Sequence, residues 1–252
     1  MTRTAADWAA YLDVFHQAHP GITEAVLRRA HADGTTPYQW LAETVPAGGV
    51  LLDLACGSAP MCAVLPPAVR YLGVDRSSAE LAAARTADVG PLLRADATAL
   101  PLASGSIDTV VCSMALMLLT PLPRALREIR RVLRRGGLLV ATVPATGPLR
   151  AGDYALAAAL LLAIRRTLRY PNDRAMRHLP AALARAGLEL RSDERRCFTL
   201  PLTRPDDGSL LLDSLYLPGL TPTAHRRALR VLRAAHRTEV PIPLRRITAR
   251  AR

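Results

Sequence analysis

The sequence predicts an α/β fold built on a mostly parallel β-sheet with helices on both faces. Between residues 50 and 143, short apolar segments of strand character alternate with helical segments. This alternation is typical of parallel sheets, whose strands are buried on both faces and joined by crossover helices. The chain has 252 residues, of which 50% are hydrophobic, so it is long enough to bury a substantial core.

Three helices are expected before the first strand. The residues that recur at helical spacing on one face of the first helix are Trp8, Tyr11, Leu12, Phe15 and His19. Pro20-Gly21 ends this helix, and a second one over ITEAVLRRAHA ends before Gly34. A capping box formed by Thr36 and Gln39 begins the third helix, which stops at PAGG, residues 46–49.

The alternating region provides five strands and two helices. The strands are expected at 50–55, 71–75, 91–96, 109–113 and 138–143. A helix rich in alanine follows SSAE at 77–80, which has the form of a capping box. A second helix covers 123–135 and is stopped by Gly136-Gly137.

The pattern changes at about residue 150. Helices are predicted at 152–168 and 180–186, and a mostly helical stretch covers roughly 207–236. Two more strands are predicted, one within 188–202 and one at 239–250. No internal repeat or low-complexity linker interrupts the chain.

Composition favours a cytoplasmic protein without a membrane partner. The longest apolar run, 155–164, is too short to cross a bilayer, and the N-terminus lacks the pattern of a secretory signal. The four cysteines are Cys56, Cys62, Cys112 and Cys197. They show no metal-ligand spacing, so free thiols in a reducing compartment and no metal site are expected.

The net charge is +12, and arginine supplies all of the positive side-chain charge, because the chain contains no lysine. The arginines are spread along the sequence, and their densest pairs fall on predicted helices. A nucleic-acid-binding protein usually gathers its charge in a patch or stripe. Solvated helix faces are therefore the favoured interpretation, and a nucleic-acid partner is not expected.

Acidic and small residues gather at the predicted ends of successive strands. VLLDLACGSAP carries Asp53 inside an apolar strand and then turns at small residues, although an unpaired buried charge is costly. The next strands end at Asp75, at Asp96-Ala97 and at Ser113-Met114. Ligands of open α/β sheets bind beyond the carboxyl ends of the strands, so this edge is the expected binding site.

These four segments, in this order, resemble the class I S-adenosylmethionine-dependent methyltransferases, and most closely their type 11 subgroup. The resemblance covers roughly residues 45–145 and rests on VLLDLACGSAP, GVDRS, RADATALPLASGSID and ALREIRRVLRRGGLLVATVP. It implies a Rossmann-like, doubly wound, seven-stranded sheet in which the last strand is antiparallel. It also implies S-adenosylmethionine as the cofactor, with S-adenosylhomocysteine as its product.

The resemblance assigns the strand-end residues to parts of the cofactor. It implies that Asp53 lies near the methionine amino group, and that Asp75 accepts hydrogen bonds from both ribose hydroxyls. Asp96 and Ala97 would contact the adenine, and Ser113 and Met114 the methionine and methyl sulfonium. The cofactor-binding residues expected in this way are Asp53, Ala55, Cys56, Gly57, Asp75, Arg76, Asp96, Ala97, Ser113 and Met114.

The turn after the first strand departs from the family pattern of three alternating glycines. Ala55 and Ala59 replace the first and third glycines, and Gly57 alone is kept. Alanine disfavours a positive φ angle, so a slightly different turn or weaker cofactor binding is expected.

Candidate catalytic residues come from the N-terminal segment. Residues 51–150 contain no histidine, and Tyr71 is their one aromatic residue, whereas the first 45 residues concentrate both kinds of side chain. The resemblance implies that this segment forms a lid. His16 or His19 is the candidate general base and Tyr11 a candidate substrate contact, beside the alternative that all three only pack a helix.

The chain is thus expected to divide into a helical lid at 1–45, a cofactor-binding core at 46–145, and a part at 146–252. The last part would combine a helical substrate-binding insertion with the last two strands of the sheet. Its polar and aromatic candidates are Tyr154, Tyr170, His178, Asp213 and Tyr216. Core helices are the alternative interpretation of each.

The predicted function is methyl transfer from S-adenosylmethionine to a small, fairly hydrophobic molecule in specialised metabolism. Two alternatives stay open at this point. One is an RNA methyltransferase, for which the positive charge is the argument. The other is a non-catalytic or non-methylating protein that keeps the cofactor-binding fold, for which the missing glycines are the argument.

Overall fold

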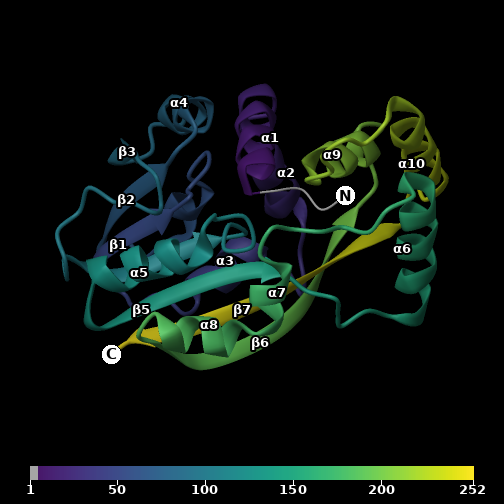
Figure 1. The fold of residues 1–252 in the computed structure, drawn as a ribbon. Helices are drawn as coiled ribbons and strands as arrows, with labels where there is room; N and C mark the ends of the chain where they lie inside the picture. Colours follow the sequence, from purple (N-terminus) through teal and green to yellow (C-terminus); the bar gives the residue numbers. More distant parts are fainter. Residues whose placement is uncertain (1–4) are drawn as a thin grey trace.

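A computed structural model of the chain describes residues 5–252 (Figure 1). The helices are α1 (Ala5–Ala18), α2 (Ile22–Arg29), α3 (Pro37–Ala42), the 3₁₀ helix η1 (Pro60–Val64), α4 (Ser78–Thr86), α5 (Leu122–Val132), α6 (Ala151–Ile164), α7 (Asp173–Arg177), α8 (Leu179–Arg185), α9 (Asp207–Ser214) and α10 (Pro222–Ala234). The strands are β1 (Gly49–Leu54), β2 (Val69–Asp75), β3 (Leu92–Arg94), β4 (Ile107–Ser113), β5 (Leu133–Pro144), β6 (Leu188–Pro201) and β7 (Glu239–Ala251).

The seven strands form one sheet in the order β3-β2-β1-β4-β5-β7-β6. Strand β7 is antiparallel to both of its neighbours, while the other pairings are parallel. The predicted fold class, a doubly wound sheet with its last strand antiparallel, is confirmed. The strand order reverses between β1 and β4, which is where such sheets place their ligands.

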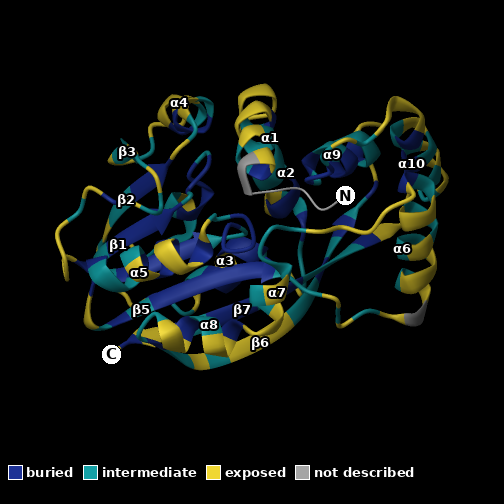
Figure 2. Cartoon of the chain, viewed as in Figure 1, coloured by how far each residue is buried: buried dark blue, intermediate teal, exposed yellow. Residues whose placement is uncertain are grey.

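Helices cover both faces of the sheet, and neighbouring residues of each central strand face opposite layers. Leu52 and Val110 pack with α5 and α8 on one face. Leu51 and Val111 pack with α3 and η1 on the other. Because both faces are buried, the central strands appear as continuous apolar runs in the sequence and as dark ribbons in Figure 2.

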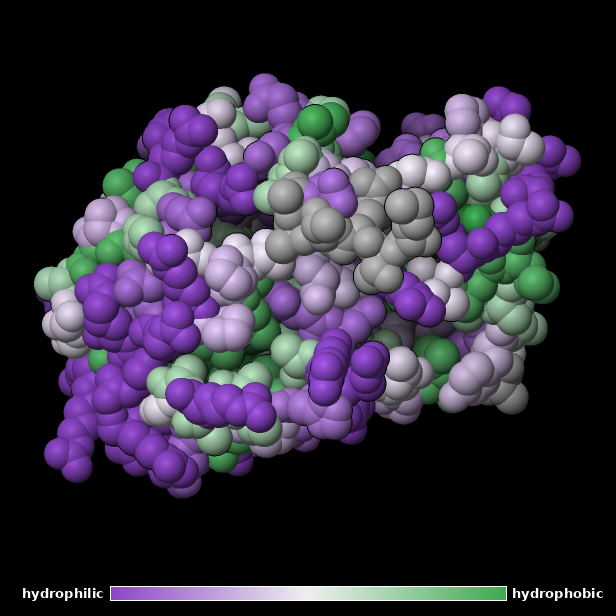
Figure 3. All heavy atoms as spheres, viewed as in Figure 1, coloured by the Kyte–Doolittle hydropathy of each residue, from purple (hydrophilic) through white to green (hydrophobic). Residues whose placement is uncertain are grey.

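The C-terminal strands β6 and β7 extend beyond the rest of the sheet and carry a second layer of helices (Figure 1). Their far ends contribute Leu200 and Val240 to an apolar cluster with α6, α9 and α10. The outer side of α6 stays open to solvent: Leu162 is 76% exposed, and apolar side chains gather over this part of the molecule in Figure 3.

Helix α1 stands between α4 and α9, above the carboxyl ends of β1 and β2 (Figure 1). Its buried Trp8 and Phe15 pack with Met117, Leu118 and Tyr216. The predicted lid at 1–45 therefore lies on the side of the sheet edge expected to bind the cofactor, although its first four residues are outside the described part. Its closing and opening stay a prediction.

Helix α5 and strand β5 meet earlier than the sequence predicts. The helix ends at Val132, and β5 begins at Leu133 and runs through Gly136-Gly137. The register against β4 shifts between Ile107, which pairs with Leu133, and Thr109, which pairs with Leu138. The glycines thus form a bulge inside the strand rather than a helix stop, which their tolerance of unusual backbone angles permits.

One of the two predicted capping boxes forms completely. Thr36 and Gln39 satisfy each other's backbone at the start of α3. At α4, Ser77 accepts a hydrogen bond from the backbone of Glu80, but the Glu80 side chain turns away toward α1. The prediction of a second capping box is therefore wrong for the Glu80 side chain, because its carboxylate binds His16 instead of the backbone of Ser77.

Other segments differ in length or were not predicted. Helix α6 ends at Ile164 rather than 168, and the stretch 207–236 divides into α9 and α10. The short helices η1 and α7 were not predicted. No helix among residues 5–252 combines the length and apolar character needed to cross a membrane.

Candidate functional site

A cavity lies at the carboxyl ends of β1 to β4 and is covered by α1, α2 and the segment around Tyr216. All ten residues predicted to bind the cofactor line this one cavity. They come from four separate strand ends, so the topology of the sheet is what brings them together. Their contacts with a cofactor stay a prediction.

The turn after β1 keeps a left-handed backbone at all three positions of the glycine pattern. The φ angles are +57° at Ala55, +55° at Gly57 and +59° at Ala59. A Cβ atom added to Gly57 would lie 1.9 Å from Oε1 of Glu24, so a side chain at this position would displace the Glu24 carboxylate. The two alanines therefore adopt the family's turn, at the conformational cost that glycine avoids.

Asp75 lines the cavity at the end of β2 and is 9% exposed. Its Oδ2 accepts a hydrogen bond from the backbone N–H of Gly57 at 2.9 Å, and its Oδ1 accepts one from Ser77 at 2.8 Å. Burial raises the pKa of this carboxyl above its usual value, and the two backbone hydrogen bonds oppose the rise. Each oxygen keeps a further lone pair for a ligand hydroxyl.

Asp53 is an acid inside an apolar strand, where an unpaired charge would be costly. It is 1% exposed, and its Oδ2 accepts a hydrogen bond of 2.9 Å from the hydroxyl of Tyr71 on β2. Burial raises its pKa to about 7, against the lowering effect of that hydrogen bond. Tyr71 is thus the partner that makes the buried acid tolerable.

The remaining strand ends complete the cavity wall. Asp96 accepts a hydrogen bond of 2.7 Å from the backbone of Thr98. Its partial burial acts to raise its pKa, but the Thr98 hydrogen bonds and two nearby arginines lower the pKa below its usual value. Met114 has a φ of +55°, which is rare for a side chain of its size and marks a locally strained backbone in the cavity wall.

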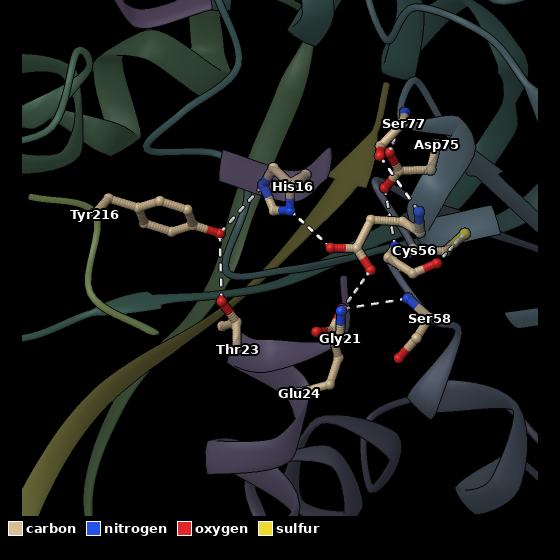
Figure 4. Close-up of polar contacts among 11 residues, drawn as sticks. His16, Gly21, Thr23, Glu24, Cys56, Ser58, Asp75, Ser77 and Tyr216 are labelled. Atoms are coloured by element: carbon tan, nitrogen blue, oxygen red, sulfur yellow. Dashed lines mark hydrogen bonds and ion pairs between the residues drawn. The ribbon is translucent and has the colours of Figure 1, made fainter. Parts of the chain in front are cut away.

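His16 reaches the cavity from α1 and connects two groups (Figure 4). Its Nδ1 lies 2.7 Å from Oε1 of Glu80, and its Nε2 lies 3.5 Å from the hydroxyl of Tyr216. Burial acts to lower the pKa of His16, but the hydrogen bond and charge of Glu80 raise the pKa above its usual value overall. With Nδ1–H donated to the carboxylate, Nε2 of the neutral ring is a proton acceptor.

The other two catalytic candidates face elsewhere. His19 and Tyr11 line a separate shallow hollow on the surface between α1 and α9. The Tyr11 hydroxyl accepts a hydrogen bond of 3.0 Å from the backbone of Leu217. Of the three candidates, His16 is therefore the one that the structure brings to the cavity.

Among the described residues of 146–236, Tyr216 is the one that lines the cavity. Tyr154 is 56% exposed on α6, and Asp213 pairs with His225 at 2.7 Å. Tyr170 packs near α1, and His178 lies between α7 and α8. The apolar residues of α6 pack against α10 or face solvent, so they do not surround this cavity.

Two acids that the structure places at the site, Glu80 and Glu24, were not predicted as site residues. Glu80 was interpreted only as a capping residue, yet it is 2% exposed and also accepts a 2.9 Å hydrogen bond from the backbone of Gly21. Glu24 lines the cavity from α2, next to the turn at Gly57. Both positions are single acids at helix starts, which in sequence are indistinguishable from ordinary first-turn residues.

Comparison with known proteins finds sequence similarity in the region that carries the strand-end residues. Residues 52–141 match the family model Methyltransf_11, described as a methyltransferase domain. The chain is 38% identical over 125 residues to malonyl-[acyl-carrier protein] O-methyltransferase of Alcanivorax borkumensis, covering 47% of this chain and 42% of that protein. It is 37% identical over 107 residues to demethylmenaquinone methyltransferase of Mycobacterium sp. (strain KMS), covering 40% of this chain and 46% of that protein. The chain thus spans less than half the length of these relatives.

A solved structure shares the fold over nearly the whole chain. It is phosphoethanolamine N-methyltransferase 2 of Haemonchus contortus, in complex with phosphomonomethylethanolamine and S-adenosylhomocysteine. The TM-score is 0.55 at 14% identity, covering 97% of this chain and 60% of that one. At such low identity the likeness concerns the fold.

Proposed function

Since residues 52–141 belong to the class I S-adenosylmethionine-dependent methyltransferases, whose cofactor is S-adenosylmethionine, we propose that this protein methylates a small, fairly hydrophobic molecule in specialised metabolism. The observation that carries the proposal is the pairing of His16 with Glu80 at the cavity that the strand-end acids line. The relatives' names give different acceptors, malonyl-[acyl-carrier protein] and demethylmenaquinone, so the acceptor must be argued from this chain's own residues.

The cavity fits the cofactor in the kind and order of its groups. Acceptors for hydroxyl and amino groups lie at Asp53, Asp75 and Asp96, and apolar walls are provided by Leu54 and Val74. The left-handed turn at Gly57 lets a ligand approach the backbone closely. In this proposal Asp75 holds the ribose, Asp96 and Ala97 the adenine, and Asp53 lies near the methionine end.

The chain's own part in the reaction is to orient the acceptor and to take up its proton. When bound, the cofactor supplies a methyl group on a positively charged sulfur for in-line displacement. Glu80 fixes the ring of His16 so that Nε2 can accept the proton of an acceptor hydroxyl. Leu12, Leu118 and Tyr216 line the same cavity and would exclude water around the reacting atoms.

The test is methyl transfer from labelled S-adenosylmethionine to hydroxylated apolar small molecules and, separately, to RNA. Label in a small molecule is the expected result. Label in RNA alone would support the RNA methyltransferase alternative. Tight cofactor binding without transfer to any acceptor would support the non-methylating alternative.

Asp75→Ala tests the cofactor orientation. It should weaken binding of S-adenosylhomocysteine by about 1.5–3 kcal/mol, the range for hydrogen bonds to a charged acceptor, as measured by calorimetry. The exposed Asp206→Ala is the matched control and should bind like wild type. Equal affinity of Asp75→Ala and wild type would exclude the ribose role.

A further inference from the structure

Glu24 reaches from the lid helix α2 onto the turn that the cofactor must approach. Its Oε1 accepts a hydrogen bond of 3.3 Å from the backbone N–H of Ser58. The same oxygen lies where a Cβ atom at Gly57 would be (1.9 Å). Figure 4 shows Glu24 below the turn, on the side of Gly21. A lid residue thus contacts the core at the end of the cavity assigned above to the methionine.

The groups around Glu24 are mostly acids. Glu80 of α4, Asp53 of β1 and Asp75 of β2 are buried. Their charges act on one another, and His16 of α1 is the cationic group that acts on Glu24. The other titratable neighbours are Tyr38 of α3, Tyr216 and Cys56 of the turn, and burial raises the pKa of all three so that they stay neutral. Burial and the charge of Glu80 raise the pKa of Glu24 to about 7.

An excess of buried acid favours a cationic ligand at this end of the cavity. The pairing of His16 with Glu80 leaves Glu24 and Asp53 without a cation beside them among the described residues. The amino-acid end of the cofactor and of its product carries an ammonium group. Such a group can donate to a carboxylate in a short, charge-assisted hydrogen bond.

We propose that Glu24 binds the α-ammonium group of the cofactor and of its product, and so joins the lid to the core when the site is filled. The proposal rests on the proposed function, because it takes the cofactor to lie with its methionine end at Gly57. An ammonium group favours the ionised carboxylate, so binding at neutral pH releases to solvent the share of a proton that Glu24 holds in the free protein.

The experiment compares two ligands that differ only at the amino-acid end. S-adenosylhomocysteine carries the ammonium group, and 5′-deoxy-5′-methylthioadenosine lacks the amino acid. Glu24→Gln should weaken binding of the first by about tenfold or more and leave binding of the second unchanged, as measured by calorimetry. Gln keeps an acceptor for Ser58 N–H, so the fold is retained. Glu43→Gln, an ion-paired acid outside the cavity, is the matched control.

Proton release gives a second readout. From pH 6 to pH 8, wild type should gain about tenfold in affinity for S-adenosylhomocysteine, because a group of pKa near 7 must lose its proton. Glu24→Gln should lose most of this gain. Calorimetry in two buffers of different ionisation enthalpy should show fewer released protons for the variant.

The outcomes separate this inference from the proposed function. A wild-type protein that binds neither ligand would overturn both. A wild-type protein that binds S-adenosylhomocysteine, together with a Glu24→Gln variant of equal affinity and equal proton release, would overturn only the role of Glu24. Glu24→Asp, which keeps the charge on a shorter side chain, should recover part of the affinity.

Discussion

Alanine occupies a left-handed backbone at two positions of the turn after β1, Ala55 and Ala59. Such a conformation costs roughly 1–2 kcal/mol for a residue with a Cβ atom. The turn persists because its neighbours hold it: Cys56 N–H donates to Val74, and Gly57 N–H donates to Asp75. Alanine in place of the two glycines therefore raises the conformational energy of the turn but leaves its backbone shape unchanged.

Ala55→Gly should raise the stability of the protein by about 1 kcal/mol, because glycine adopts this φ angle without strain. Ala82→Gly, in an exposed position of α4, is the control of opposite sign and should cost about 1 kcal/mol. Thermal unfolding of the two variants measures both. A lowered melting temperature for Ala55→Gly would show that the turn carries no such strain.

His16 and His19 lie three residues apart on α1, but only His16 lines the cavity. His16→Ala should reduce turnover about 10²-fold or more, the range for a lost general base, and His19→Ala should leave turnover near wild type. The measurement is initial rate against pH with an active acceptor. Similar rates for both variants would leave His16 as a packing residue.

At the scale of elements, helix α1 contacts the rest of the protein through several separate interactions. Its apolar face packs on Met117 and Leu118, Asp13 pairs with Arg76 at 2.8 Å, and Tyr11 accepts from Leu217. The Asp13–Arg76 pair is exposed and contributes little by itself. The apolar contacts, together with the His16–Glu80 pair at 2.7 Å, therefore set the cost of lifting the helix.

Deleting residues 1–19 should leave the sheet folded but reduce turnover far more than cofactor affinity. Among the described residues, the deletion removes the cavity-lining side chains of Ala9, Leu12, Asp13 and His16, whereas Asp75 and Asp96 belong to the core. Circular dichroism checks the fold, and calorimetry with S-adenosylhomocysteine checks affinity. Val14→Ser, at a side chain 69% exposed, is the control. Unchanged turnover in the truncated protein would rule out the lid.

Elements with a strong periodic pattern were predictable from the sequence, and those defined by tertiary contacts were not. Apolar runs identified the five parallel strands β1 to β5, because parallel strands tend to be buried on both faces. Gly136-Gly137 misled the prediction of α5, because the bulge between β4 and β5 depends on pairing with a distant strand. The Glu80 side chain left its local cap for His16, a partner 64 residues away.

At the scale of the whole molecule, the cofactor side of the candidate site was predictable because it follows the sheet, and His16 and Tyr216 were among the candidates named outside it. The strand-end acids could be placed together because the topology fixes where strand ends meet. Glu24, by contrast, reaches the site through the packing of α2 on the turn at Gly57. A helical substrate-binding insertion was expected within 146–252, but its helix α6 packs in a separate cluster with α9 and α10.

The acids and the histidine of the cavity also act on the stability of the whole fold. Burial raises the pKa of both Glu24 and Asp53 to about 7. Between about pH 4 and 7 the folded state therefore holds protons that the unfolded chain has released, so stability falls as pH rises. His16, whose pKa is raised by Glu80 against burial, acts in the same direction, because its added stability is lost above its folded pKa.

The melting temperature of the ligand-free protein should therefore be highest near pH 5 and fall by about 5 °C toward pH 8, a change on the order of 2 kcal/mol. Below pH 5 the sign reverses, because hydrogen bonds or arginines lower the pKa values of Asp96, Asp193 and Glu128, and those interactions are lost on protonation. Thermal unfolding from pH 4 to 8.5 measures the curve. In Glu24→Gln the melting temperature should fall less between pH 5 and pH 8, because the amide does not titrate. Melting temperatures that rise steadily to pH 8 in wild type would mean that these acids are already ionised in the folded protein.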